Sequence, residues 1–374
     1  MRILRTTSLS AACAAACTIL PGSVLAADPA KVPIVVETYR YMEGTLDLEF
    51  GNDWVFRADD PGAEVDDLYF LGELGVRLGL TPIFAINLGL TAESVLDPEP
   101  FEGRAFGDIG LYVDTLNLEA QLGAAKLFAG KFGPAFGTAW DITPGVYGTE
   151  FAEDYELSEQ IGFGAAYEFD AGTAGKHTLG GHVFFVDTTF LSDSIFTRRG
   201  RVGIDDGGIA NTETLNNFSI TLDGTEIEAL PGFSYNLGYR HLSAGATETA
   251  DEDGFVAGLA KETAFANGMV LGLNGEIAYF SDAAGVAGDD AVYTTVGLSI
   301  ANGPWHGELA GTVRRFDLAG AGSTSDHIAQ VSAGYGFENG IDVSAGYAHV
   351  READLDYDII GLRLTKSFEF TSRK

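Results

Sequence analysis

The segment Gly361–Phe370 alternates apolar and polar side chains. Ile360 and then Leu362, Leu364, Phe368 and Phe370 share one parity, and the residues between them are mostly polar or charged. Successive side chains of a strand point to opposite faces, so this segment as a strand has one apolar and one polar face. Similar alternation recurs from about residue 44 onward, and no stretch sustains the 3.6-residue period of a helix. The chain is therefore predicted to be all-β.

The make-up of the two faces indicates lipid on one side and water on the other. The apolar faces are aliphatic in the middle of each segment and aromatic near its ends, whereas the polar faces carry Gly, Ser, Thr, Asn and charged residues. That arrangement is typical of a membrane barrel around an aqueous lumen. The alternative is a soluble β-sandwich or propeller, whose apolar faces would meet in a core.

Short and longer polar links alternate between the amphipathic segments, which number sixteen; the last two of the longer links are residues 317–325 and 351–355. The parity is ambiguous in three of them, residues 177–190, 213–223 and 254–265. An even number of strands with short turns at one end and longer loops at the other is the pattern of outer-membrane barrels. We therefore predict a 16-stranded antiparallel transmembrane β-barrel with both chain ends on the periplasmic side. Sixteen strands leave an aqueous channel.

The first 26 residues have the features of an export signal. Arg2 and Arg5 precede an apolar run from Leu9 to Leu20, and small residues end at Ala26. We expect residues 1–26 to be a cleaved signal peptide and residues 27–374 to be one outer-membrane barrel domain. An N-terminal anchor helix is the alternative. Both cysteines of the chain lie inside the signal, so the barrel domain has neither disulfides nor a thiolate site.

The third of the longer links, residues 133–156, is rich in both aromatic residues and carboxylates. Loops of this length are usually functional or disordered, and the aromatic content disfavours disorder. We expect it to fold into the lumen and to narrow the pore; an outward cap or a subunit contact is the alternative. The candidate constriction residues are Trp140, Asp141, Tyr147, Glu150, Glu153, Asp154 and Glu156.

Basic residues supply the second set of candidates. Those on the polar parity of the predicted strands are Arg77, Arg240, Arg314 and Arg363. A charge at membrane depth is tolerated where it faces water or a partner. Facing the loop carboxylates, these arginines would set up a transverse field across the pore. The alternative is that each one pairs with a neighbouring wall acid, such as Glu73, Glu276 or Glu308.

The fourth long link contains Arg198, Arg199 and Arg201 within four residues. We expect this cluster either to attract anions, phosphate included, or to contact lipopolysaccharide phosphates or a neighbouring subunit.

The overall charge and the absence of catalytic motifs exclude several classes of function. The chain has 54 acidic and 22 basic residues, a formal net charge of −32, which disfavours nucleic-acid binding. Its six histidines show no metal-binding spacing, and no G-x-S-x-G motif is present. No enzymatic activity, cofactor or metal is expected.

Two stretches resemble a known family. A-G-K-F-G-P-A-F-G (Ala129–Gly137), continuing to Gly164, and L-S-D-S-I-F-T-R-R-G-R (Leu191–Arg201) resemble trimeric porins of Gram-negative outer membranes, closest to those loosely grouped with the phosphate-selective porin O/P type. The resemblance implies a homotrimer of 16-stranded monomers, each pore narrowed by its third loop. Two features differ from that family: Thr371–Lys374 follow the terminal aromatic residue, and few basic residues are available to line a phosphate path.

The expected function is that of an outer-membrane porin, a water-filled channel for passive diffusion of small hydrophilic solutes and ions. The alternative is a substrate-specific outer-membrane channel or receptor for an anion, a sugar or a metal chelate. An outer-membrane enzyme or adhesin is a third hypothesis. The expected partners are outer-membrane lipid and lipopolysaccharide, the solutes, and the barrel-assembly machinery, which would recognise the C-terminal strand.

Overall fold

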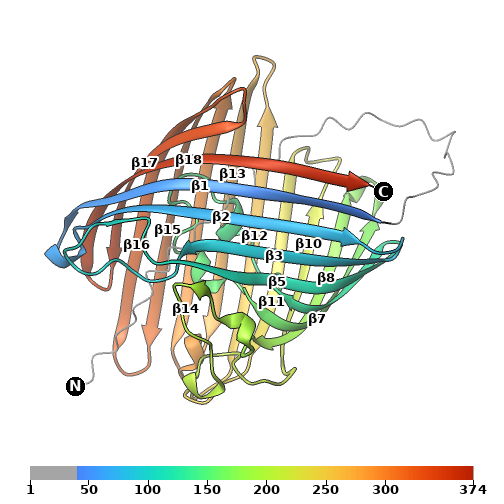
Figure 1. The fold of residues 1–374 in the computed structure, drawn as a ribbon, viewed down its shortest axis with the longest axis horizontal. Helices are drawn as coiled ribbons and strands as arrows, with labels where there is room; N and C mark the ends of the chain where they lie inside the picture. The colour runs from blue at the N-terminus through green and yellow to red at the C-terminus, as the bar shows by residue number, and fades with distance from the viewer. Residues whose placement is uncertain (1–39, 374) are drawn as a thin grey trace.

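Sixteen long antiparallel strands form a closed barrel in the computed structural model, which describes residues 40–373 (Figure 1). Each strand pairs with its neighbours in sequence, and β1 (Tyr41–Ala58) also pairs with β18 (Leu355–Arg373). The predicted number of strands and the antiparallel barrel are confirmed. The predicted signal peptide lies outside the described residues.

The other barrel strands follow in chain order, and two further strands of two residues each, β4 (Arg104–Ala105) and β9 (Ile195–Phe196), belong to loops. The bounds are β2 (Asp66–Gly79), β3 (Phe84–Ser94), β5 (Ile109–Leu122), β6 (Ala125–Phe132), β7 (Gln160–Asp170), β8 (Lys176–Val186), β10 (Asn217–Thr225), β11 (Phe233–Leu242), β12 (Glu252–Ala264), β13 (Met269–Ser281), β14 (Asp290–Asn302), β15 (Trp305–Leu318), β16 (Gly322–Gly336) and β17 (Ile341–Glu352). The three segments of ambiguous parity are all strands, β8, β10 and β12.

Most apolar side chains of the barrel strands lie outside, and most polar side chains lie inside. Val296 and Leu362 on the outer face are 58% and 54% exposed, whereas Thr295 and Thr312 on the inner face are each 1% exposed. A soluble protein does the reverse, so a sandwich or propeller with an apolar core is ruled out. Among residues 40–373, no helix has the length and hydropathy needed to cross a membrane.

One end of the barrel has short turns and the other has most of the long loops. Loops 1 to 6 at the second end comprise residues 59–65, 95–108, 133–159, 187–216, 243–251 and 282–289. The prediction of two further long links, at 317–325 and 351–355, is wrong. The strands there pair as far as Leu318↔Gly322 and Glu352↔Leu355, because residues with positive φ, such as Gly320 and Asp354, allow tight turns.

Two loops extend the sheet where a strand stops early. β6 ends at Phe132, and loop 4 places β9 against the part of β5 that β6 leaves unpaired, with Gly110 opposite Phe196. Loop 2 does the same for β2, where Asp67 lies opposite Arg104. Backbone groups that would otherwise lack a partner are thereby hydrogen-bonded. β6 is short because the chain turns inward after it, and this turn creates the candidate site.

The inverted polarity predicts different costs for charges on the two faces. Val296→Arg puts a cation at the middle of the outer face and should destabilise the barrel in lipid vesicles by about 2–4 kcal/mol. Ser299→Arg, on the inner face of the same strand, should cost clearly less because its charge reaches the lumen. Urea unfolding in vesicles measures both; equal costs would contradict the assignment of the faces.

Candidate functional site

Loop 3, residues 133–159, lies inside the barrel against the inner face of the wall. It contains the short helix α1 (Ala139–Ile142) and a single 3-10 turn at Glu153–Tyr155. Between Phe136 and Glu156, in the described part of the chain, every hydrogen bond and ion pair from the loop to a barrel strand goes to β1 or to a strand from β11 to β18. The predicted folding of the loop into the lumen is confirmed, and the loop follows one side of the barrel.

A single carboxylate on β13 holds both ends of this loop. Glu276 accepts hydrogen bonds from the Thr138 backbone N–H at 2.7 Å, the Thr138 hydroxyl at 3.0 Å and the Ala139 N–H at 3.2 Å. It also accepts one from the Tyr155 hydroxyl at 2.6 Å, at the far end of the loop. Glu276 is only 5% exposed, and a buried carboxylate is tolerated when it is hydrogen-bonded in this way.

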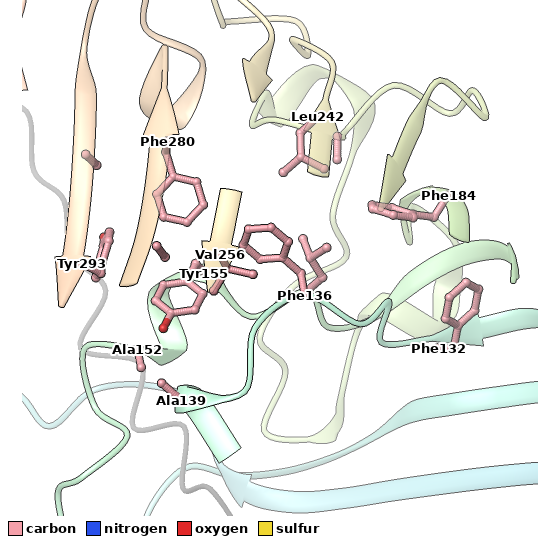
Figure 2. Close-up of a cluster of buried hydrophobic side chains, with 14 residues drawn as sticks. Phe132, Phe136, Ala139, Ala152, Tyr155, Phe184, Leu242, Val256, Phe280 and Tyr293 are labelled. Carbon is pink, nitrogen blue, oxygen red and sulfur yellow. The ribbon is translucent and has the colours of Figure 1, made fainter. Parts of the chain in front are cut away.

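Aromatic packing holds the same part of the loop against the wall. The rings of Phe136 and Tyr155 from the loop meet Phe280 of β13, with centroids 5.8 to 6.4 Å apart (Figure 2). Tyr293 of β14 packs edge-on to Tyr155 at 5.3 Å. Such pairs each contribute about 0.5–1.5 kcal/mol beyond area burial. The loop is therefore a fixed element of the lumen.

Three of the four predicted wall arginines bind either loop 3 itself or a wall residue that loop 3 contacts. Arg240 pairs with Glu252 at 2.7 Å and donates to the Tyr155 carbonyl oxygen at 2.8 Å. Arg314 pairs with Asp154 of the loop at 2.6 Å, with Asp326 at 3.0 Å, and with Glu352.

The third of these, Arg363, pairs with Glu49 at 3.0 Å and Asp53 at 2.7 Å, and Asp53 also accepts the hydroxyl hydrogen bond of Tyr147. Arg77 lies apart from the loop and pairs with Glu119 at 2.8 Å. All four arginines thus have carboxylate partners, and these differ from Glu73, Glu276 and Glu308, the acids named from the sequence.

The predicted constriction residues fall into two groups. Tyr147 and Asp154 contact the wall as described above, and Trp140 donates its ring N–H to the Phe136 carbonyl oxygen at 3.0 Å. Asp141, Glu150, Glu153 and Glu156 remain partly or fully exposed. Loss of hydration around the Glu150 carboxyl and the nearby negative charge of Asp53 raise the pKa of Glu150 to about 7. The positive charge of Arg363 opposes this shift. Burial also raises the pKa of Glu153 and Glu156 above the usual range.

The three arginines of loop 4 are held by contacts within the protein. Arg198 pairs with Asp193, and Arg201 donates to the Thr188 carbonyl oxygen at 2.7 Å. Arg199 pairs with Glu159 at 2.6 Å and lies over the Tyr112 ring, 3.7 Å from its centroid. Two of the three charges therefore already have a carboxylate partner.

Sequence reasoning missed two residues that position loop 3. Glu276 was recognised only as a wall acid, because nothing local in the sequence marks it as the clamp of loop residues that lie 121 to 138 positions earlier. Lys131, 2% exposed, lies between Glu159 at 2.7 Å and Asp187 at 2.8 Å and joins loops 3 and 4. Its position in the A-G-K-F-G motif is the feature of the sequence that could have indicated this role. Within residues 40–373, no cluster of His, Cys, Asp or Glu is suited to a metal ion.

No protein-family model matches the sequence, and no curated protein is similar enough to count as a relative. Solved structures do share the fold. OpdK of Pseudomonas aeruginosa, crystallised with vanillate, is 15% identical with a TM-score of 0.52, covering 88% of this chain and 99% of OpdK. OccK2 of the same organism, in complex with glucuronate, is 12% identical with a TM-score of 0.52 over 88% and 98% of the two chains.

The outer-membrane channel DcaP of Acinetobacter baumannii is 12% identical with a TM-score of 0.57, covering 87% of this chain and 96% of DcaP. Each match extends over nearly the whole barrel. At these identities, the comparison shows that this chain has the barrel fold of outer-membrane channels.

The clamp predicts that loop 3 depends on Glu276. In Glu276→Ala, the Thr138 and Ala139 amides lose their acceptor, which costs about 1–3 kcal/mol per unsatisfied group. Amide exchange across residues 136–156 should then accelerate about 10- to 100-fold. Tyr155→Phe, which removes one of the four hydrogen bonds, is the matched milder variant and should have a smaller effect. Unchanged protection of the loop in Glu276→Ala would refute the clamp.

Proposed function

We propose that this chain is an outer-membrane porin of a Gram-negative bacterium, a water-filled channel for passive diffusion of small hydrophilic solutes and ions. The observation that carries the proposal is a closed barrel with an apolar exterior and a polar lumen. Loop 3 is fixed inside this lumen and occupies part of it. Such a barrel matches the needs of a pore in lipid, because the backbone is paired within the wall and the inner face can be hydrated.

A second candidate is a substrate-specific channel. It is favoured by the fold shared with OpdK and OccK2, which were crystallised with vanillate and glucuronate. Both ligands are carboxylate anions, and binding them calls for accessible cations. In this chain Arg240, Arg314 and Arg363 are each less than 10% exposed and paired with carboxylates, so capture of an anion by these residues is disfavoured.

The pairing of the lumen arginines with carboxylates also disfavours phosphate selectivity, which the resemblance of the motifs within residues 129–201 to phosphate-selective porins would imply. A phosphate path needs free basic side chains, and the lumen offers few of them. The proposal has further parts. Residues 1–26 direct export, the protein is a homotrimer in contact with lipopolysaccharide, and the assembly machinery recognises β18. In loop 4, Arg198, Arg199 and Arg201 attract anions.

The direct test is conductance of the folded protein in a planar lipid bilayer. Stepwise increases in current are expected on insertion. Flux of neutral sugars into liposomes should be linear in concentration for a diffusion porin and saturable for a specific channel. Correctly folded barrels that insert but conduct no current would contradict the proposal.

The raised pKa of Glu150 predicts a pH-dependent pore. This carboxyl is neutral well below pH 7 and charged above it, so conductance for K⁺ in dilute salt should rise as the pH increases from about 6 to 8. Folding also raises its affinity for the proton, so protonation stabilises the folded loop, and stability should fall as the pH rises from about 4.5 to about 7. Glu150→Gln should remove the part of the conductance step near pH 7; an unaltered step would assign it to other groups.

A further inference from the structure

The buried arginines that hold loop 3 and a row of acids that lack a basic partner among residues 40–373 lie on different sides of the lumen. Arg240, Arg314 and Arg363 stand on β11, β15 and β18, on the side that loop 3 follows. Each is buried and has at least one carboxylate within 3.0 Å. Positive charge on this side is therefore covered and neutralised before a solute can reach it.

The side formed by β2, β3, β5 and the part of β1 that precedes Asp53 is open, because loop 3 reaches β1 at Asp53. A hollow of about 430 Å³ lies against these four strands, and loop 3 contributes no residue to its lining. Its charged lining residues are Glu43, Asp47, Glu73, Arg77 and Asp114. Arg77 is engaged by Glu119 at 2.8 Å and lies 3.7 Å from Glu43, so it leaves three acids to consider.

These three acids form a row across the wall. Asp47 of β1 lies directly opposite Glu73 of β2 in the strand register. Glu73 in turn lies opposite Thr91 of β3, whose hydroxyl donates to Asp114 of β5 at 2.8 Å. Within the described part of the chain, none of the three acids has a basic side chain within 4.0 Å.

Such a row is unfavourable for the fold. Like charges directly opposite each other on neighbouring strands are destabilising, and no cation on the wall offsets the Asp47–Glu73 pair. The contrast with Glu49 and Asp53 on the same strand is informative, because Arg363 binds both of those. At pH 8 the acids of the row therefore contribute an unneutralised negative potential to the open half of the lumen.

Loop 3 faces the lumen with the same sign. Asp141, Glu153 and Glu156 form no ion pair among residues 40–373, and Asp141 is exposed. A solute in the lumen thus meets the acidic wall and, in loop 3, the exposed carboxylate of Asp141. In a narrow, low-dielectric passage, charge of one sign concentrates counter-ions and excludes co-ions.

We infer that the open path along β1, β2, β3 and β5 selects small solutes of net positive charge, with Asp47, Glu73 and Asp114 as the residues that determine this selectivity. The inference rests on the proposed channel function and specifies its substrate class. It also separates this chain from the neighbours crystallised with carboxylate ligands.

The reversal potential of the folded protein in a planar bilayer tests the inference. With KCl gradients near 0.1 M, where the Debye length is about 10 Å, the wild type should show a K⁺ to Cl⁻ permeability ratio well above one. The triple variant Asp47→Asn/Glu73→Gln/Asp114→Asn should lower that ratio at least about twofold. Removing like charges should also leave the barrel no less stable.

The matched control removes three acids from exposed positions in loops 2 and 4. Glu99→Gln/Glu102→Gln/Asp205→Asn changes the net charge by the same amount but lies outside the hollow. It should keep the wild-type ratio. A wild type that prefers anions or shows no preference, or equal ratios in the two triple variants, would overturn the inference while leaving a working channel. Absence of current from inserted barrels would instead refute the channel function.

Liposome swelling extends the test to organic solutes. Arginine and glutamate are of similar size but opposite net charge, so arginine should enter wild-type proteoliposomes severalfold faster. The lumen variant should reduce this difference and the loop control should keep it. Equal entry of the two amino acids into wild-type proteoliposomes would contradict selection by charge.

Discussion

Closure of the backbone hydrogen-bond ladder is the constraint on which the rest of the structure depends. β1 pairs with β18 on one side and β2 on the other, so no long strand has a free edge. With the backbone satisfied inside the wall, the outer face can be apolar and the inner face polar. Where strands end unevenly, β4 and β9 extend the pairing from loops. The early end of β6 frees the chain to enter the lumen as loop 3.

Loop 3 then divides the lumen electrostatically. Glu276 and the aromatic group around Tyr155 fix the loop to one side, and the arginines of that side are used to hold it. The cations that might have lined a path for anions are therefore structural. The acids Asp47, Glu73 and Asp114 on the other side have no such role, which is why we relate them to the passage of solutes.

The fold was predictable from the sequence because a barrel strand repeats every two residues, and outer and inner faces differ in chemistry along every segment. Leu362 and Arg363, for example, fall on opposite parities of the sequence, and the structure exposes Leu362 on the outer face and buries Arg363 on the inner face. Two long links were wrong because the strands continue into tight turns, at Gly320 and at Ala353-Asp354, whose flanking residues are polar enough to resemble loops. The site was less predictable: the path of loop 3 into the lumen followed from its aromatic content, but its anchors did not. Glu276 and Arg314 lie on strands far from loop 3 in the sequence, and only the closed barrel brings them to Thr138, Asp154 and Tyr155.

The central claim is a hydrated lumen inside an apolar wall, and single-cysteine accessibility tests it most directly. Residues 27–374 contain no cysteine, so Glu73→Cys and Val296→Cys each provide one unique thiol. In a bilayer recording, a small water-soluble cationic thiol reagent should react with the cysteine at position 73 and lower the current. It should leave the cysteine at position 296, which faces lipid, unmodified. Reaction at position 296 with protection at position 73 would contradict the account.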